Sequence, residues 1–318
     1  MRALIIGIGG QDGSYLADVL LERGYEVAGI YRHSSVDNLQ RIKHIKDKVT
    51  LYPGDLLDTT TTIRTLKDYQ PDEVYNEADQ DNVPWSHNVP GISCDVTAGA
   101  VGKLLESVYQ TNKDIKVFQP LSATMFATGN LTQNEQTRFN PQSPYACGKV
   151  AAYYLCRYYR ETKDMFVATA IFFNHDSPRR SEDYLLNKIC NSVVRMAKGE
   201  QDMLYLGNLA TQVDIGFAWE YMVAAHSIMQ CEVPDDFVIG TGVGHTIEEW
   251  VATACKVAKL DGRCRVGMDT KYYRPGLTPY SVADITKAYR TFGFNPQYQM
   301  KELVEVLVRD ALCASAVK

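Results

Sequence analysis

The sequence has no pair of cysteines in the CxxC spacing that zinc sites and redox motifs use. Its eight cysteines are scattered along the chain, at Cys94, Cys147, Cys156, Cys190, Cys231, Cys255, Cys264 and Cys313. Scattered single cysteines are typical of reduced thiols in a protein core rather than of a zinc site or a disulfide framework. We therefore expect reduced cysteines and no bound metal.

The sequence also lacks any run of about 18 apolar residues, the length that a membrane-spanning helix requires. Its first ten residues, MRALIIGIGG, enter a strand pattern at once and show no charged or apolar region of a signal peptide. It contains no internal repeat, low-complexity tract or flexible linker. These features predict a cytoplasmic protein that does not insert into a membrane.

An excess of basic residues is missing as well, because 33 Lys and Arg residues against 38 Asp and Glu residues give a formal net charge of −5. This balance provides no broad basic surface for nucleic acid, so individually placed groups must bind any polyanionic ligand. Of the 318 residues, 45% are apolar, which is enough to build a substantial core. The length fits one large domain or two closely packed ones.

Short apolar segments alternate with helical patterns over the first 173 residues. The segments are rich in β-branched and aromatic residues and predict buried strands at 3–8, 25–31, 48–52, 73–78, 116–122 and 166–173. Apolar residues that recur every three and four positions predict helices at 15–24, 59–69, 100–110 and 149–163. This alternation predicts an α/β fold with a doubly wound parallel sheet.

Beyond about residue 175 the pattern becomes looser. It predicts helices at 187–198, 216–230, 246–258 and 299–315 and a short strand at 236–240. We interpret this part as a smaller C-terminal domain packed on the first. The expected boundaries are 1–172 plus 213–240 for the sheet domain, and 173–212 plus 241–318 for the smaller domain.

The first predicted strand leads into GIGGQDG, in which Gly7, Gly10 and Gly13 are spaced three apart before a helix that starts near Ser14. Glycines permit a tight turn and a close approach of the backbone to a pyrophosphate, and the helix N-terminus offers free N–H groups and a partial positive charge. An ordinary glycine-rich turn is the alternative. The position between a strand and a helix at the N-terminus favours a dinucleotide site in a Rossmann-type sheet domain.

The second predicted strand ends in RHSS (32–35), where a site that prefers NAD places an acid to hold the ribose 2′-hydroxyl. A cation and two hydroxyls suit a 2′-phosphate, so we expect NADP rather than NAD. The alternative is that Arg32 is an ordinary surface residue. Asp55 and Leu56 follow the third strand and are placed to face the adenine, although Asp55 is equally suited to cap the next helix.

Tyr145 and Lys149 in SPYACGK are four residues apart, so a helix would place both side chains on one face. Tyrosine, with a pKa of about 10, is a poor base at neutral pH, but a nearby ammonium favours the phenolate and can hold a nicotinamide ribose. The phenolate then takes a proton from a sugar hydroxyl as hydride leaves the same carbon. Ser122, at the end of the preceding strand, would hydrogen-bond the reacting oxygen.

The YxxxK spacing also occurs by chance in a chain with 20 tyrosines. It is the glycine turn about 135 residues upstream that favours a catalytic interpretation. Cys147, which lies between the two residues, would point to another face of the helix and is interpreted as a packing residue.

With these motifs the chain resembles the extended short-chain dehydrogenase/reductases, and among them most closely the GDP-mannose 4,6-dehydratase family. The resemblance covers nearly the whole chain and follows the family's blocks in order, with GQDGSYLADVLLERGYEV, RHSSVDNLQRI, GDLLD, SPYACGK, FFNHDSPRR, LGNL, DFVIGTG and KYYRP. GQDGSYL and NHDSPRR are more specific to this family than to the superfamily. The resemblance also implies a homodimer or homotetramer.

The resemblance implies two sets of binding residues. The implied NADP contacts are Gly7, Ile8, Gly9, Gly10, Gln11, Asp12, Arg32, Ser34, Ser35, Asp55, Leu56, Tyr145, Lys149, His175 and Arg180. The implied substrate contacts are Asn174, Lys188 and Arg274, the last through the pyrophosphate oxygens that the arginine fork binds well. Without the resemblance, Asn174 would be interpreted as a helix cap and the two cations as solvated surface charges.

One departure from the family affects the chemistry directly. The family carries Thr-x-Glu at the end of the strand that precedes the Tyr/Lys pair, and this chain has Ser122 and Thr124 there. In a dehydratase of this type, Tyr and NADP oxidise C4, Glu removes the C5 proton as the C6 hydroxyl departs, and hydride returns to C6. A threonine hydroxyl cannot replace a carboxylate in that role, and losing one such group commonly costs about 10²–10⁴-fold in rate.

Other departures lie in the walls of the expected site. Where the family has NLAAQS this chain has NEADQD (76–81), which places Glu77, Asp79 and Asp81 beside the nicotinamide or on the solvent side of a loop. In the first case one of them is a candidate substitute base. An arginine of the family is replaced by Val213 and a glutamate by Leu277, and both exchanges weaken the case for GDP-mannose itself.

These observations predict an NADP-dependent enzyme that oxidises a sugar hydroxyl, at C4, with the sugar joined to a nucleoside diphosphate and a GDP-linked sugar favoured. Tyr145, Lys149, Ser122 and Thr124 are the candidate catalytic residues. Water elimination with an atypical base stays open. The alternatives are a nucleotide-sugar 4-epimerase, dehydrogenase or ketoreductase, which needs no C5 base, and a cofactor-binding homologue with little turnover, against which the intact Tyr/Lys pair argues.

Overall fold

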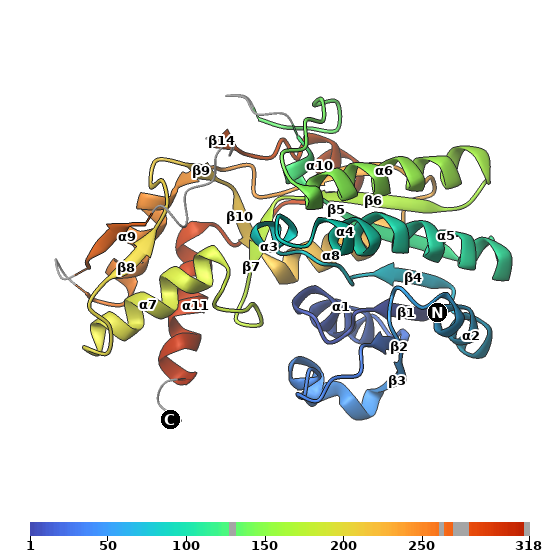
Figure 1. Ribbon diagram of the computed structural model, residues 1–318, viewed down its shortest axis with the longest axis horizontal. Coiled ribbons are helices and arrows are strands. Elements are labelled where there is room, and N and C mark those ends of the chain that lie inside the picture. Colours follow the sequence, from blue (N-terminus) through green and yellow to red (C-terminus); the bar gives the residue numbers. More distant parts are fainter. Residues whose placement is uncertain (127–131, 261–263, 270–279, 315–318) are drawn as a thin grey trace.

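The computed structural model describes residues 1–126, 132–260, 264–269 and 280–314. Within these residues, seven strands form a parallel sheet (Figure 1). Their spatial order is β11 (Asp236–Ile239), β6 (Val167–Phe172), β5 (Lys116–Ser122), β4 (Glu73–Asn76), β1 (Arg2–Ile6), β2 (Glu26–Tyr31) and β3 (Val49–Pro53). The order reverses between β1 and β4, and ligands of such sheets bind beyond the carboxyl ends of the strands at that reversal.

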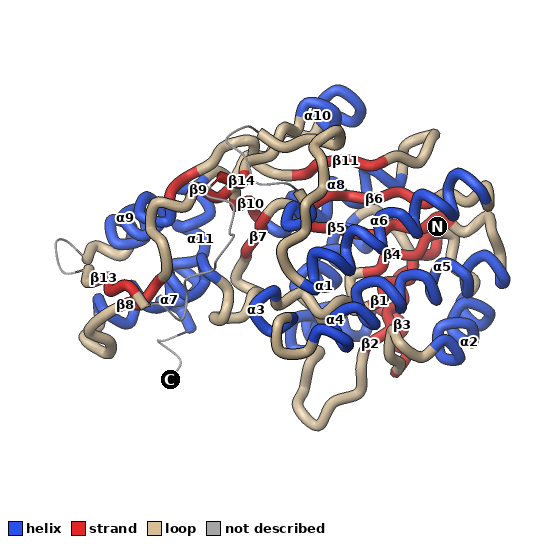
Figure 2. The backbone as a smooth tube through the Cα atoms, turned by 45° about the horizontal axis from the view of Figure 1, so that its top comes forward, coloured by secondary structure: helices blue, strands red, loops and turns tan. Residues whose placement is uncertain are grey.

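Helices cover both faces of the sheet (Figure 2). One face packs against α1 (Gln11–Glu22), α8 (Ala218–Met229), α10 (Thr286–Phe292) and the 3₁₀ segment η1 (Gln40–Lys48). The other face packs against α2 (Thr59–Tyr69), α5 (Ala100–Thr111) and α6 (Pro144–Thr162). Because both faces are covered, β4 and β6 are buried along their whole length, as central parallel strands are. The predicted doubly wound α/β fold is confirmed.

Most predicted elements agree with the observed ones to within two residues, and the largest differences are the early starts of two helices. The helix α1 begins at Gln11, immediately after the glycine turn, rather than near Ser14. The helix α6 begins at Pro144, one residue before Tyr145, rather than at the predicted position 149. Ser143 caps it by accepting a hydrogen bond from the Ala146 N–H, and proline is favoured at the first helical position.

A third hydrophobic core lies away from the sheet, at the left of Figure 1. It is formed mainly by α7 (Leu185–Ala197), α9 (Ile247–Val257) and α11 (Met300–Ala314), with Trp250 among its fully buried side chains. Short strands border it, namely β7 (Asn174–Asp176), β8 (Leu204–Leu206), β9 (Gln212–Val213), β10 (Ile215–Phe217), β12 (His245–Thr246), β13 (Val266–Met268) and β14 (Tyr280–Ser281). The exact domain boundaries stay a prediction.

The polar residues of interest lie in connections at the carboxyl end of the sheet. After β4 come the short helices α3 (Val83–Ser86) and α4 (Pro90–Cys94) and the π-helical segment η2 (Asp95–Gly99), which continues into α5. The 3₁₀ turn η3 (Ala123–Met125) follows β5. Single π-helical turns inside α-helices are frequent at functional sites.

The expectation of reduced cysteines is wrong for one pair, because Cys255 and Cys264 form a disulfide. Cys255 lies near the end of α9 and Cys264 just before β13, and their separation of nine residues is not one that a CxxC spacing could reveal. The other six cysteines are free. In the described part of the chain, no helix is long and apolar enough to cross a membrane, and no group of three or more His, Cys, Asp or Glu residues is arranged to hold a metal.

Candidate active site

Tyr145 and Lys149 lie one turn apart on the first half of α6 and are almost completely buried, with 7% and 4% of their surfaces exposed. The Lys149 Nζ atom lies 5.7 Å from the centre of the Tyr145 ring. It also donates a hydrogen bond to the Pro120 carbonyl of β5 at 2.8 Å. The predicted pairing of these two side chains on one helix face is therefore present.

The end of β5 supplies two hydroxyls beside this pair. Ser122 caps η3 by accepting from the Thr124 N–H, and the two hydroxyl oxygens are 2.9 Å apart. Ser122 also acts to lower the pKa of the nearby Tyr145 phenol. The structure thus brings together all four candidate catalytic residues, with Thr124 exposed where the family has its carboxylate.

The loop after β4 places a carboxylate against Lys149. The Asp79 Oδ2 atom forms an ion pair with the Lys149 Nζ atom at 2.7 Å, and the two side chains are 14% and 4% exposed. The solvent-side interpretation of this loop is therefore wrong for Asp79. Asp79 also holds Lys149 in the charged form. Burial acts to lower the pKa of the ammonium, but Asp79 raises it above the usual value.

The same ion pair changes the acidity of the phenol. Burial raises the pKa of Tyr145 to about 12, and the Lys149 charge that opposes this rise is itself countered by Asp79 and Asp81. The sequence alone predicts a phenol made acidic by its neighbouring ammonium. In the structure the Asp79 carboxylate is in contact with the ammonium, at 2.7 Å, and opposes this effect.

Asp79 is held in place by the π-helical segment. Thr97 of η2 donates its hydroxyl to the Asp79 Oδ1 atom at 2.7 Å, and the Gln80 N–H donates to the same oxygen at 2.7 Å. Thr97 can approach because Gly148 of α6 has no side chain, since a Cβ atom there would meet the Thr97 Cβ at 3.0 Å. These two hydrogen bonds therefore fix the Asp79 carboxylate independently of its contact with Lys149.

The glycine turn has the shape that a dinucleotide pyrophosphate requires. Gly7 has a φ of +88°, which favours glycine, and a Cβ atom on Gly9 would lie 2.5 Å from the Asn38 carbonyl of the loop after β2. The N-cap residue of α1 is Gly10, and no side chain caps the helix. The N–H groups of the first turn of α1 are thus free of a side-chain cap, an arrangement that suits a phosphate.

Glu77 lies directly beside this turn, because a Cβ atom on Gly7 would meet the Glu77 carbonyl group at 2.9 Å. Burial raises the pKa of Glu77 well above its usual value, with the Asp12 charge acting in the same direction. Its Oε1 atom is buried and has no hydrogen-bond partner among the described residues. A buried carboxyl with an unsatisfied polar atom fits a ribose hydroxyl of a dinucleotide, so the residues around the glycine turn are suited to such a ligand.

Asp12, in the first turn of α1, pairs with His175 of β7, whose Nε2 atom lies 3.0 Å from the Asp12 Oδ2 atom. Burial acts to raise the pKa of Asp12, but His175 and Arg180 bring it down to about 2. Burial acts to lower the pKa of His175, but Asp12 raises it above its usual value. The ion pair between Asp12 and His175 joins the first turn of α1 to the strand β7.

This pair predicts a stability maximum between pH about 4 and about 6.5. The Asp12 contribution is complete above its unfolded pKa of about 3.9 and is lost as the pH falls toward 2, and the His175 contribution is complete below its unfolded pKa of about 6.5 and is lost as the pH rises through its folded value. Urea unfolding should show Asp12→Asn about 1–2 kcal/mol less stable at pH 5.5 and the difference smaller at pH 3. Asp114→Asn, at an exposed position, is the control, and a difference independent of pH would contradict the prediction.

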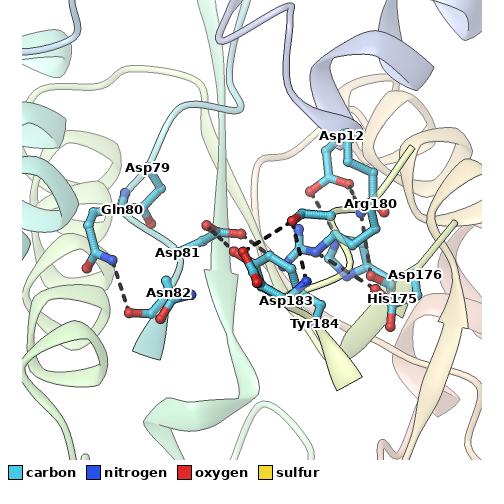
Figure 3. Close-up of polar contacts among 12 residues, drawn as sticks. Asp12, Asp79, Gln80, Asp81, Asn82, His175, Asp176, Arg180, Asp183 and Tyr184 are labelled. Carbon is cyan, nitrogen blue, oxygen red and sulfur yellow. Dashed lines mark hydrogen bonds and ion pairs between the residues drawn. The ribbon is translucent and has the colours of Figure 1, made fainter. Parts of the chain in front are cut away.

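Arg180 and Asp81 face each other near the carboxyl end of the sheet (Figure 3). The Arg180 Nη2 atom lies 2.9 Å from the Asp81 Oδ2 atom, and the Tyr184 hydroxyl donates to the Asp81 Oδ1 atom at 2.7 Å. The guanidinium also lies over the Tyr184 ring, 3.5 Å from its centre. The contacts join the loop after β4 to the segment before α7, so a phosphate that binds Arg180 has to compete with Asp81.

The remaining predicted cofactor residues lie in the loops after β2 and β3 or in the glycine turn itself. Arg32, Ser34 and Ser35 are exposed in the loop after β2, as either a 2′-phosphate site or an ordinary surface loop would be. Asp55 accepts a hydrogen bond from the Leu57 N–H, and Leu56 is buried. The alternative role of Asp55 as a helix cap is wrong, because Asp58 caps α2 instead. The positions of Ile8 and Gln11 are also at the turn, and both are buried.

Two of the three predicted substrate residues lie in the described part of the chain. Asn174 is exposed and begins β7, so its alternative role as a helix cap is wrong. Lys188 lies on α7 and donates to the Tyr205 carbonyl of β8 at 2.8 Å. Arg274 and Leu277 lie outside the described residues. Val213 is buried in β9.

Two arginines near the glycine turn were missed by the sequence analysis. Arg41 donates to the Gly9 carbonyl at 3.2 Å and to the Arg179 carbonyl at 2.6 Å. Arg179 pairs with Asp18 at 2.7 Å and lies over the Tyr15 ring. Both fall in the blocks RHSSVDNLQRI and NHDSPRR, which were the signal that could have revealed them.

Residues 4–307 match the family described as GDP-mannose 4,6 dehydratase. The chain belongs to this family. It is 39% identical to GDP-mannose 4,6 dehydratase 2 of Arabidopsis thaliana over 322 residues, which cover 98% of this chain and 86% of that protein. The resemblance inferred from the sequence blocks is thereby confirmed, as is the expectation of an enzyme of the nucleotide-sugar dehydratase and epimerase type at the level of the family.

Solved structures with the same fold have lower sequence identity to this member of the GDP-mannose 4,6-dehydratase family. UDP-glucose 4-epimerase of Thermotoga maritima, solved with UDP-glucose, has a TM-score of 0.87 at 21% identity and covers all of both chains. RMD from Pseudomonas aeruginosa, solved with NADPH, has a TM-score of 0.82 at 19% identity and covers 98% of this chain and 99% of that one. These likenesses establish the fold.

Proposed function

We propose that this chain catalyses NADP(H)-dependent redox chemistry at C4 of a sugar joined to a nucleoside diphosphate, with a GDP-linked sugar favoured. The family membership supports the substrate class, because the relatives are named for GDP-mannose. The observation that carries the reaction type is the assembly of Ser122, Tyr145 and Lys149 at the carboxyl end of the sheet. The nicotinamide, when bound, supplies or accepts the hydride.

The chain's own residues have separable roles in this proposal. Tyr145 exchanges a proton with the C4 oxygen, and Ser122 hydrogen-bonds that oxygen. Lys149 has three N–H donors, of which Asp79 and Pro120 use two among the described residues, so the third can hold a ribose hydroxyl. The first turn of α1, which no side chain caps, and the buried Glu77 carboxyl are the groups that would face the dinucleotide. The preference for NADP over NAD rests on the cation and two hydroxyls of the RHSS segment, which suit a 2′-phosphate.

The site argues against water elimination. Elimination requires a base that removes the C5 proton, and Thr124 supplies only a hydroxyl where the family has a carboxylate. Of the three acids that could replace it, Asp79 is in an ion pair with Lys149 and Asp81 with Arg180, and Glu77 is buried against the Gly7 turn. We therefore favour C4 redox or epimerisation without elimination over dehydration.

The test is to incubate the protein with NADP⁺ or NADPH and a panel of nucleotide sugars, including 4-keto sugars, and to weigh the products. A gain or loss of two hydrogens, or an unchanged mass with inverted C4, supports the proposal. Loss of water contradicts the reaction type, and no conversion of any sugar with either form of the cofactor contradicts the function itself.

Replacing Thr124 by glutamate should introduce the missing step. The new carboxylate would lie beside Ser122 and Tyr145, where a general base contributes about 10²–10⁴-fold to a proton transfer. We expect Thr124→Glu to release a product lighter by one water from a nucleotide sugar that the unchanged protein does not dehydrate. Thr124→Gln has the same shape without the charge and should not do so. Equal amounts of dehydrated product from both variants would contradict the role of the carboxylate.

A further inference from the structure

The ion pair between Asp79 and Lys149 bears on the direction of the reaction. A phenolate is needed to take a proton from an alcohol, and a neutral phenol is needed to give a proton to a ketone. A lone ammonium near the phenol favours the phenolate, but an ammonium in contact with a carboxylate acts on its surroundings as a weaker dipole. The 2.7 Å contact with Asp79 therefore removes much of the field that would make Tyr145 a base.

We propose that this site is built for reduction, with Tyr145 standing as a neutral phenol that donates its proton to the oxygen of a 4-keto nucleotide sugar, because Asp79 neutralises Lys149. The inference rests on the proposed function and specifies its direction and substrate class. Asp79 is a positioning residue in this scheme, since it acts on Tyr145 through Lys149.

Asp79 is fixed as a partner of Lys149. Thr97 and the Gln80 N–H hold its Oδ1 atom, and this leaves the Oδ2 atom directed at the Lys149 ammonium. Lys149 is fixed in turn by the Pro120 carbonyl. Breaking the ion pair would leave two charges in a buried place, so the pair is expected to persist when ligands bind.

Groups of both kinds surround Tyr145. Lys149, on the same helix, and Ser122, from β5, act to lower the pKa of the phenol. Asp79 and Asp81, from the loop after β4, act to raise it, and the Tyr184 phenol lies on the same side in the segment before α7. One ammonium is thus set against two carboxylates, and burial adds to their effect.

Reduction also accounts for Thr124. A ketone at C4 is reduced by one hydride and one proton, and no proton at C5 has to move. The carboxylate that the family needs for elimination is then unnecessary, and a hydroxyl at position 124 costs nothing in rate. One direction of reaction thus explains both the added acid at position 79 and the missing acid at position 124.

The step balances with NADPH as the reductant. The C4 carbon gains a hydride from bound NADPH, the C4 oxygen gains the Tyr145 proton, and the C=O double bond becomes a CH–OH group. The products are NADP⁺, an alcohol and a tyrosinate that takes a proton from solvent. A 4-keto substrate has to come from a reaction that oxidises C4 of a nucleotide sugar, such as a dehydration, and the product is a nucleotide sugar with a C4 hydroxyl.

The first test reads the protonation of Tyr145 without turnover. In protein with ¹³C at tyrosine Cζ, the Tyr145 signal is assigned by its loss in Tyr145→Phe and followed from pH 6 to 11. In the unchanged protein we expect no titration of this signal below pH about 10, the ordinary pKa of tyrosine. In Asp79→Asn we expect a midpoint at least about one pH unit lower than in the unchanged protein. A midpoint below pH 8 in the unchanged protein, or identical midpoints in the two proteins, would overturn the inference.

The second test measures kcat/KM in both directions between pH 6 and 9. With Tyr145 neutral, reduction of the 4-keto sugar is independent of pH, and oxidation of the alcohol rises about tenfold per pH unit, because the phenolate fraction does so. In Asp79→Asn the oxidation profile levels off and the reduction profile begins to fall. A flat oxidation profile in the unchanged protein would overturn the inference while the proposed function stands. Absence of conversion in either direction would overturn the proposed function.

Discussion

Replacing Tyr145 by phenylalanine is expected to lower the rate of hydride transfer by about 10²–10⁴, the usual contribution of one general acid or base. The ring keeps its packing because phenylalanine differs only by the hydroxyl, and 93% of the residue surface is already buried, with 7% exposed. Only the proton that moves to or from the C4 oxygen is removed. The measurement is single-turnover absorbance of the reduced nicotinamide at 340 nm with the substrate found in the panel.

The variant should still bind the dinucleotide, because the glycine turn and the Lys149 ammonium are unchanged. Dissociation constants from calorimetry should therefore stay within about threefold, an effect of less than about 1 kcal/mol. Tyr154→Phe is the matched control, since Tyr154 lies on the same helix with 57% of its surface exposed and should turn over normally. A Tyr145→Phe variant that turns over at the normal rate would remove the basis of the proposed function.

The sequence was sufficient for the sheet and for the Tyr/Lys pair because both depend on local patterns. β-branched runs between helical patterns predicted the strands to within about two residues of β2 and β5, and the spacing of four placed Tyr145 and Lys149 on one face of α6. Such patterns are local because the spacing of buried side chains along a helix or strand follows from the geometry of that element alone.

The charge state of the pair could not be predicted in the same way. It depends on Asp79, which is 70 residues from Lys149 in sequence, and the two meet only because β4 and β5 are neighbours in the sheet. The sequence did mark NEADQD as unusual for the family, but a loop position does not say which cation a carboxylate will meet. The disulfide between Cys255 and Cys264 was missed because a separation of nine residues is not a spacing that marks a cysteine pair.

The interaction between Asp79 and Lys149 also predicts a large effect on stability. Replacing Lys149 by methionine keeps most of the packing volume but leaves the Asp79 carboxylate buried without its ammonium, with 14% of the side chain exposed. Removing one partner of a buried ion pair typically destabilises a protein by about 3–5 kcal/mol. We expect Lys149→Met to show this loss in chemical unfolding at pH 7.

The double variant distinguishes the lost charge pairing from lost packing. Adding Asp79→Asn to Lys149→Met removes the unpaired charge while Thr97 and the Gln80 N–H can still hydrogen-bond the amide oxygen, so most of the lost stability should return. Lys113→Met is the control, because its partner Asp164 is 95% exposed and screened by water, and the unfolding midpoint should not move. If the double variant is as unstable as Lys149→Met, Lys149 stabilises the fold through packing and the Pro120 carbonyl, and the neutralisation of its charge by Asp79 loses its thermodynamic support.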